Sequence, residues 1–128
     1  MAVAAMLAAL VAAGVTGAQA APTARSSSRA PARLLVGGDE YSITLSRRAV
    51  KHGPALIQFV NRGEDSHDLK LKRVGRSPSG TVSAPELRPG GLVQLETRLR
   101  AGHYRLWCSL PQHRQLGMQA VLIVRGGR

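Results

Sequence analysis

The run Gly102-His-Tyr-Arg-Leu-Trp-Cys108-Ser-Leu-Pro-Gln-His113-Arg-Gln-Leu-Gly-Met118 decides both the fold and the site that we expect for this chain. Cys108 is the only cysteine, His113 follows it by five residues, and Met118 follows His113 by five more. A thiolate, an imidazole and a weakly bound thioether suit a copper ion that cycles between two oxidation states. The spacing therefore predicts a copper site in this run.

Strand-like segments flank the three candidate ligands. Tyr104, Leu106 and Cys108 alternate with polar or bulky residues and share one strand face. Tyr104 follows a turn glycine, which fits either a tyrosine corner or an ordinary core position. Residues 120–124 are apolar throughout, which favours a strand covered on both sides. A loop held at both ends by sheet can hold ligands rigidly, so the run is suited to binding an ion.

A second imidazole is needed to complete such a site, and His67 is the candidate. His67, Leu69 and Leu71 alternate with charged residues, so a period of two places His67 on the same inward face as two core leucines. We interpret the other two histidines, His52 in a turn and His103 on the opposite strand face from the cysteine, as surface residues.

The segments before this run indicate an all-β domain. Alternating or apolar strand-like stretches occupy residues 41–46, 55–60, 67–72 and 92–97, with Gly and Pro at the turns between them. We expect residues 74–91 to be a long irregular connection with a short strand near 81–82. No segment has a helical period, and there is no internal repeat. About seven or eight short strands predict a β-sandwich with Greek-key connections.

The chain is expected to have three parts. Residues 1–20 are apolar and uncharged and end in Ala18-Gln-Ala20, which is typical of an export signal peptide. We expect cleavage after this triplet, with an uncleaved membrane anchor as the alternative. Residues 21–33 are predicted to be a flexible basic linker, and residues 34–128 the folded domain. The protein would then be exported, to the periplasm, the cell surface or the medium.

The formal net charge of +11 points to anionic partners. Export, and the lack of a basic stretch interleaved with aromatic residues, argue against nucleic acid. Acidic redox proteins are the expected partners, with an anionic membrane or cell-wall surface as another, and a basic surface without a particular partner is the alternative. An exported chain with one cysteine cannot form an internal disulfide, so a bound metal would explain its persistence; otherwise Cys108 is a small buried apolar residue.

These segments resemble the cupredoxin family of small blue-copper electron carriers. The resemblance covers about residues 34–128 and is most specific in the run 102–118 and in Asn61-Arg-Gly with His67 after it. The Cys-x4-His-x4-Met spacing is longer than in plastocyanin and is similar to that of the rusticyanin and auracyanin branch. The resemblance implies one copper ion in a type 1 site, with His67, Cys108 and His113 as equatorial ligands and Met118 as the axial ligand.

One position departs from the family pattern. Several members have Asn directly after the first histidine ligand, where it ties two ligand loops together, and this chain has Asp68. Ser109 is the expected partner of Asp68 across the loops. An ionised carboxylate close to the copper would favour Cu(II) and lower the reduction potential, whereas a well-bonded one would have little effect.

The resemblance implies a one-electron carrier that forms no bonds and is therefore no enzyme. The ring edge of His113 would emerge through an apolar surface, and Trp107 would be either a second electron route or a packing residue. Arg105 and Arg114 would steer an acidic partner. The residues expected to form the apolar surface are Leu110, Pro111, Leu116 and Gly117.

Two other functions fit the same fold. A copper-handling protein would use the same ligands but would need further exposed Met or His clusters, which the sequence after residue 20 does not offer. A metal-free interaction domain would have lost a ligand. A multicopper enzyme would need more copper centres and histidines than this chain provides.

Overall fold

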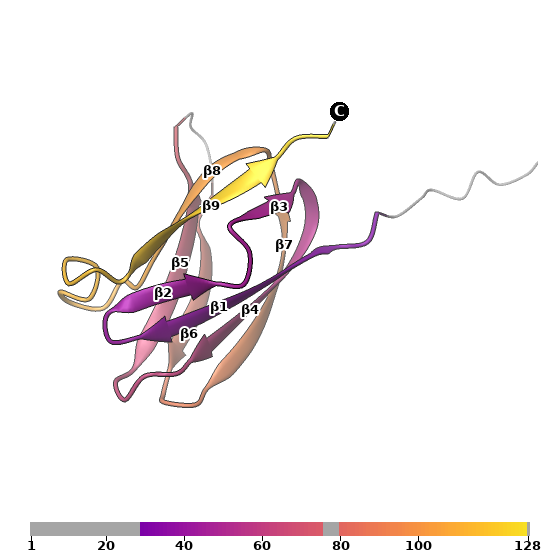
Figure 1. The fold of residues 1–128 in the computed structure, drawn as a ribbon. Coiled ribbons are helices and arrows are strands. Elements are labelled where there is room, and N and C mark those ends of the chain that lie inside the picture. Colours follow the sequence, from indigo (N-terminus) through magenta and orange to yellow (C-terminus); the bar gives the residue numbers. More distant parts are fainter. Residues whose placement is uncertain (1–28, 76–79, 128) are drawn as a thin grey trace, which may run out of the picture.

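The computed structural model describes residues 29–75 and 80–127, which form nine strands and no helix (Figure 1). The expected signal peptide and residues 21–28 of the expected linker lie outside this part. The strands are β1 (Ala32–Asp39), β2 (Ser42–Leu45), β3 (Ala49–Lys51), β4 (Gly53–Asn61), β5 (His67–Arg73), β6 (Val82–Leu87), β7 (Leu92–Leu99), β8 (Gly102–Trp107) and β9 (Gln119–Arg125). The described residues contain no helix with the length and hydropathy needed to span a bilayer.

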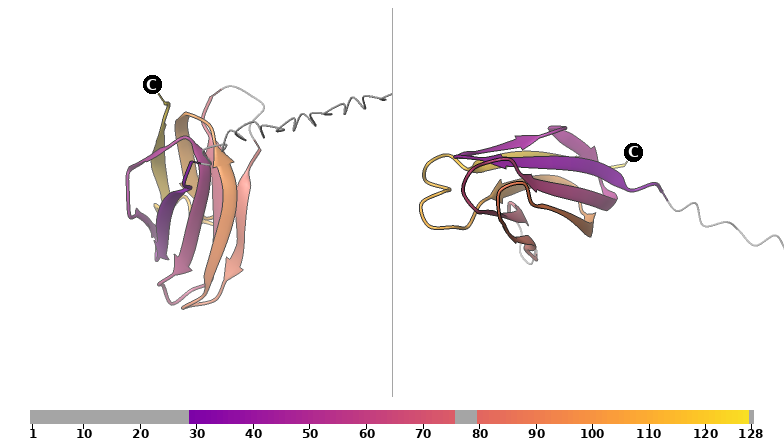
Figure 2. Two further views of the ribbon diagram at one scale, coloured as in Figure 1. Left: turned by 90° about the vertical axis from the view of Figure 1, so that its right-hand side faces the viewer. Right: turned by 90° about the horizontal axis from the view of Figure 1, so that it is seen from below.

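The strands form two sheets that face each other as a sandwich (Figure 2). One sheet has the order β2-β1-β4-β7 and the other the order β3-β9-β8-β5-β6. Both sheets are mixed, because β1 pairs in parallel with β4, and β3 in parallel with β9. The predicted all-β sandwich is confirmed, with nine strands where about seven or eight were expected.

The core lies between the sheets and follows the predicted alternation. Leu69 and Leu71 are buried together with His67. Leu106 is buried on the inner face of β8, and Cys108, the first residue after that strand, is buried as well. Burying a side chain of this size contributes roughly 1.5–3 kcal/mol to folding. The largest apolar side chains that meet them from the other sheet are Val36, Ile57 and Phe59.

A tyrosine corner closes one end of this core. The hydroxyl of Tyr104 accepts a hydrogen bond from the backbone N–H of Arg100 at 3.0 Å. The bond links β8 to the first residue after β7. Of the two roles that the sequence allows for Tyr104, the structure shows the tyrosine corner.

Two expectations for individual strands are wrong. The strand β6 runs from Val82 to Leu87 instead of forming a short strand near 81–82. It contains Pro85, which an edge strand tolerates because one side of its ladder is unpaired. In β9, Val121 and Ile123 are 56% and 41% exposed, so this strand is covered on one side only. A short apolar run indicates that one face of a strand is buried, but it does not show whether a second layer of structure covers the opposite face.

The topology brings the candidate ligands to one end of the sandwich. The strands β4 and β8 end there, and β5 and β9 begin there. The connections 62–66 and 108–118 therefore lie at the same end, although more than forty residues separate them.

Candidate metal centre

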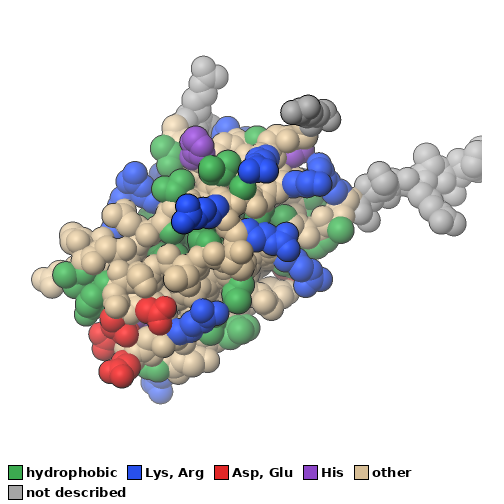
Figure 3. Space-filling model, in the orientation of Figure 1, with side chains coloured by type: hydrophobic (Ala, Val, Ile, Leu, Met, Phe, Trp, Pro, Cys, Tyr) green, Lys and Arg blue, Asp and Glu red, His purple; other side chains and the backbone are tan. Residues whose placement is uncertain are grey.

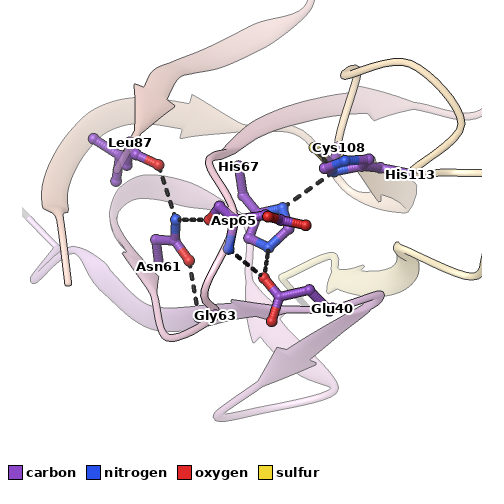
Figure 4. A network of polar contacts seen from close by, with 8 residues as sticks. All are labelled: Glu40, Asn61, Gly63, Asp65, His67, Leu87, Cys108 and His113. Atoms are coloured by element: carbon purple, nitrogen blue, oxygen red, sulfur yellow. Dashed lines mark hydrogen bonds and ion pairs between the residues drawn. The ribbon is translucent and has the colours of Figure 1, made fainter. Parts of the chain in front are cut away.

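Three of the four predicted ligands meet at this end of the molecule. One donor atom each of His67, Cys108 and His113 lies within 4.8 Å of the other two, and within the described residues no other group of His, Cys, Asp and Glu has this arrangement. The Nδ1 atoms of His67 and His113 are 3.2 Å apart, and Cys108 Sγ lies 3.5 Å from His113 Nδ1 (Figure 4). The Nδ1 of His113 thus faces both the thiol and the Nδ1 of His67.

Met118 closes the ligand turn through its backbone. The N–H of Met118 donates to the carbonyl of His113 at 3.0 Å, and the N–H of Cys108 donates to the carbonyl of Met118 at 3.2 Å. The side chain of Met118 is fully buried and packs near Gly38, where an added Cβ would lie 3.0 Å from Met118 Cε. The turn therefore fixes the backbone of Met118 beside the cluster.

The cluster fits a type 1 copper ion. One thiolate with two imidazoles is a ligand set that copper accepts in both oxidation states. His67 and Cys108 are inaccessible to solvent and His113 is partly exposed, so the site is shielded apart from one ring.

Asp68 and Ser109 tie the two ligand segments together, as the sequence predicts. Ser109 donates its backbone N–H to Asp68 Oδ1 at 2.6 Å and its hydroxyl to Asp68 Oδ2. Burial raises the pKa of Asp68, but hydrogen bonds from Ser109 and Cys108 and the charge of Lys70, 3.5 Å away, outweigh it and hold that pKa below its ordinary value. Asp68 is therefore ionised and well bonded.

The thiol of Cys108 is harder to ionise than a free cysteine. Burial raises its pKa, and the charge of Asp68 acts in the same direction, while the backbone N–H groups of Asp68 and Leu110 act against it. Since metals bind the thiolate, this thiol must release a proton when an ion binds.

Glu40 belongs to the site, although no pattern in the sequence indicates it. Its Oε1 accepts a hydrogen bond from His67 Nε2 at 2.8 Å and another from the backbone N–H of Asp65 at 2.9 Å (Figure 4). Backbone hydrogen bonds from Asp65 and Glu64, helped by His67, lower the pKa of Glu40 to about 2. Glu40 is 27 residues from His67 in the chain, and only the position of the β1 end beside the 62–66 loop brings the two together.

Asn61 holds the loop that carries these contacts. Its side chain is fully buried, donates to the carbonyls of Asp65 at 2.7 Å and Leu87 at 2.8 Å, and accepts from the N–H of Gly63 at 2.9 Å. These three bonds join the end of β4 to the 62–66 loop and to the end of β6.

Apolar residues flank His113 in the ligand turn, interspersed with the exposed Gln112 and Gln115. Leu116 is 57% exposed, Pro111 and Gly117 are exposed, and Leu110 is partly buried. The ring of Tyr41, which the sequence did not suggest, packs edge-on against His113 with centroids 4.9 Å apart.

Trp107 and the remaining histidines lie outside the cluster. Arg114 lies over the ring of Trp107 at 5.3 Å, so this tryptophan packs against a cation. His103 is exposed as expected, whereas His52 is partly buried at the opposite end of the sandwich, where its Nε2 lies 3.5 Å from Arg29 Nη1. Neither histidine joins a metal-ligating group among the described residues.

Comparison with solved structures gives the fold. Auracyanin from Roseiflexus castenholzii superposes with a TM-score of 0.61 at 16% identity, covering 73% of this chain and 96% of that chain. The chain has the cupredoxin fold. Auracyanin A from Chloroflexus aurantiacus, a "blue" copper protein, gives a TM-score of 0.58 at 18% identity. The match covers 74% of this cupredoxin-fold chain and 99% of the auracyanin A chain. Rusticyanin from Thiobacillus ferrooxidans gives a TM-score of 0.60 at 14% identity, and the match covers 73% of this chain and 76% of the rusticyanin chain. No protein-family model and no curated protein matches the sequence.

Proposed function

We propose that this protein is an exported type 1 copper protein that carries one electron between redox partners. The observation that carries the proposal is the cluster of His67, Cys108 and His113 in a cupredoxin fold. We assign these three as equatorial ligands and the buried Met118 as the axial ligand. Copper bound there would supply the one-electron redox step.

The residues around the cluster suit electron transfer rather than bond chemistry. The thiol and one imidazole are fully buried, and Asp68, Ser109 and the backbone bonds of Met118 restrain the ligand segments. Restrained ligands change little between oxidation states, which keeps the reorganisation cost low. The partly exposed ring of His113, flanked in the ligand turn by apolar residues, offers the exit route, so we propose no enzymatic activity.

The charges at the ligand end favour one orientation of a partner. Arg114 is the only formally charged residue within the stretch 110–117 beside His113. Glu40, Glu64 and Asp65 lie beside His67 at the ligand end of the sandwich. Figure 3 shows acidic side chains gathered at one end of the face that it displays. We propose that an acidic partner contacts the 110–117 turn near Arg114 and is kept from the acidic flank by like charge.

The opposite end of the sandwich is basic. Five arginine or lysine side chains and His52 line one hollow there, and none of the residues lining it is acidic. We propose that this end faces an anionic membrane or cell-wall surface and leaves the ligand end free for the redox partner. The basic residues of this hollow are Arg29, Arg33, Arg47, Lys51 and Arg125.

Export remains part of the proposal. Residues 1–20 would be the signal peptide, cleaved or kept as an anchor, residues 21–33 a linker whose last two residues begin β1, and residues 34–128 the cupredoxin domain. The protein would then be periplasmic, cell-surface or extracellular.

The experiment that tests this function is the visible spectrum of the purified chain after Cu(II) is added, beside Cys108→Ser. We expect an intense blue or green band that bleaches on reduction, returns on reoxidation and is absent from the variant. A colourless protein, or one with only weak copper absorption, would overturn the blue-copper proposal in favour of copper handling or a metal-free interaction domain.

A further inference from the structure

We propose that Glu40 is a positioning residue that fixes the ring of His67 in its metal-binding state before any metal arrives, and that its charge favours the oxidised form of the loaded site. The effect of the charge on the loaded site rests on the proposed function. The positioning of the His67 ring concerns the metal-free protein and does not depend on that function.

The hydrogen bond from His67 to Glu40 decides which ring nitrogen is free. A carboxylate can only accept, so His67 Nε2, 2.8 Å from Glu40 Oε1, must carry the proton. In a neutral imidazole the other nitrogen then has a lone pair. That nitrogen, Nδ1, is the one that faces His113 Nδ1 at 3.2 Å. Glu40 thereby selects the tautomer that turns a metal-binding lone pair toward the cluster.

The carboxylate is itself held in a close-fitting cradle. Its side chain is 29% exposed, and the N–H of Asp65 donates to Oε1 at 2.9 Å. A Cβ added to Gly63 would overlap the carboxylate of Glu40, so a larger residue at this position would push the carboxylate aside. Gly63 lies in the loop beside Glu40 (Figure 4). The buried Asn61 accepts from Gly63 N–H and donates to the Asp65 carbonyl, which fixes the cradle. Contacts therefore run without a break from Asn61 through the loop 63–65 and Glu40 to His67.

The negative charge of Glu40 acts on the ion through the ring. A carboxylate bonded to a histidine ligand makes that ligand more basic, which stabilises the more highly charged metal ion. Removing the charge while keeping an acceptor should raise the reduction potential. Removing both should also free the ring, and loss of such an outer partner typically weakens metal binding by about 10–100-fold.

The variants that separate these effects are Glu40→Gln, which keeps an acceptor without the charge, and Glu40→Leu, which removes both. The control is Glu64→Gln, which neutralises an exposed carboxylate on the same loop. Gly63→Ala is a second test, because it displaces the carboxylate without altering it. The fold of each metal-free variant is checked by its thermal unfolding midpoint.

The metal-free readout is the tautomer of His67 from the nitrogen chemical shifts of its ring. We expect a single Nε2-protonated form in the wild type, Glu40→Gln and Glu64→Gln, and a mixture of tautomers in Glu40→Leu and Gly63→Ala. An unchanged tautomer in folded Glu40→Leu would overturn the positioning role, whether or not the protein binds copper.

The second readout is the reduction potential and Cu(II) affinity of the loaded protein. We expect Glu40→Gln to raise the potential clearly more than Glu64→Gln, and Glu40→Leu to weaken Cu(II) binding by about 10–100-fold. Equal potentials in wild type and Glu40→Gln would overturn the charge effect while leaving the copper function intact. Failure of the wild type to bind copper would instead overturn the proposed function and leave the tautomer result standing.

Discussion

Ser109 donates to both carboxylate oxygens of Asp68, and this pair joins the residue after the cysteine to the residue after the first histidine. The two segments lie 41 residues apart in the chain. The distance between Cys108 and His67 is therefore set by a polar contact as well as by the sheet.

Replacing Ser109 with Ala should lower the free energy of unfolding by about 1 kcal/mol. A hydrogen bond to a charged group contributes more than this when buried, but Ser109 is exposed and water will replace part of it. Urea unfolding of the metal-free protein measures the change. The matched control is Ser83→Ala, which changes an exposed serine on β6. An equal loss of unfolding free energy in both variants would show that the contact between Ser109 and Asp68 does not stabilise the protein.

Replacing Asp68 with Asn should make the thiol of Cys108 more acidic. Burial is the main reason that the pKa of Cys108 is raised, and the charge of Asp68 adds to it. The substitution would remove the effect of the charge and leave the effect of burial. Asn can still accept from the Ser109 N–H, which keeps the segments joined. Thiolate absorbance in the ultraviolet, followed against pH in the metal-free protein, checks this, and a titration that is unchanged or moves to higher pH would contradict it. We also expect a higher reduction potential with copper bound.

The metal-free protein should lose stability in acid partly through Glu40. Its pKa is lowered from 4.5 to about 2, so the unfolded state binds this proton first as the pH falls. The contribution is therefore complete above about pH 5 and is lost progressively as the pH falls toward about 2. Unfolding midpoints between pH 6 and pH 2 should fall less steeply in Glu40→Gln than in the wild type, and parallel curves would refute the assignment.

Replacing Gly38 with Ala should disturb the packing behind the ligand turn. The new Cβ would lie 3.0 Å from Met118 Cε and 3.1 Å from a ring carbon of Phe59, and both side chains are fully buried. Overpacking of this kind costs about 1–3 kcal/mol. Unfolding of the metal-free variant measures it, with Gly80→Ala, where a Cβ meets open space, as the control. In the copper-loaded protein, a shift of Met118 should change the intensity ratio of the visible bands; an unchanged spectrum would argue against axial ligation.

Reversing the charge of Arg114 should slow electron exchange with an acidic redox protein. The side chain lies over Trp107 beside the proposed exit at His113, so an acidic partner would meet a like charge there. Arg47→Glu makes the same change in net charge at the basic end. Second-order rate constants at low and high ionic strength separate them, since the effect should shrink with salt. Equal slowing by both variants would mean that net charge alone governs association.

Much of the fold was predictable because its signals are local. The period of two in β5 and β8 records which side chains meet the core, and the Gly and Pro residues mark the turns. The exposed outer face of β9 and the full length of β6 were not predictable, because both depend on which strands lie beside or above them.

The sequence by itself determined the sandwich, the ligand turn and the candidates His67, Cys108, His113 and Met118, because spacing along one turn and alternation along a strand are covalent properties of the chain. Only the tertiary structure decided that Glu40 holds His67 and that the ligand end is acidic on one flank while the far end is basic. The contact between Glu40 and His67 depends on the parallel pairing of β1 with β4, which places residue 40 beside the 62–66 loop. Such a juxtaposition is set by sheet register, and no spacing in the sequence encodes it.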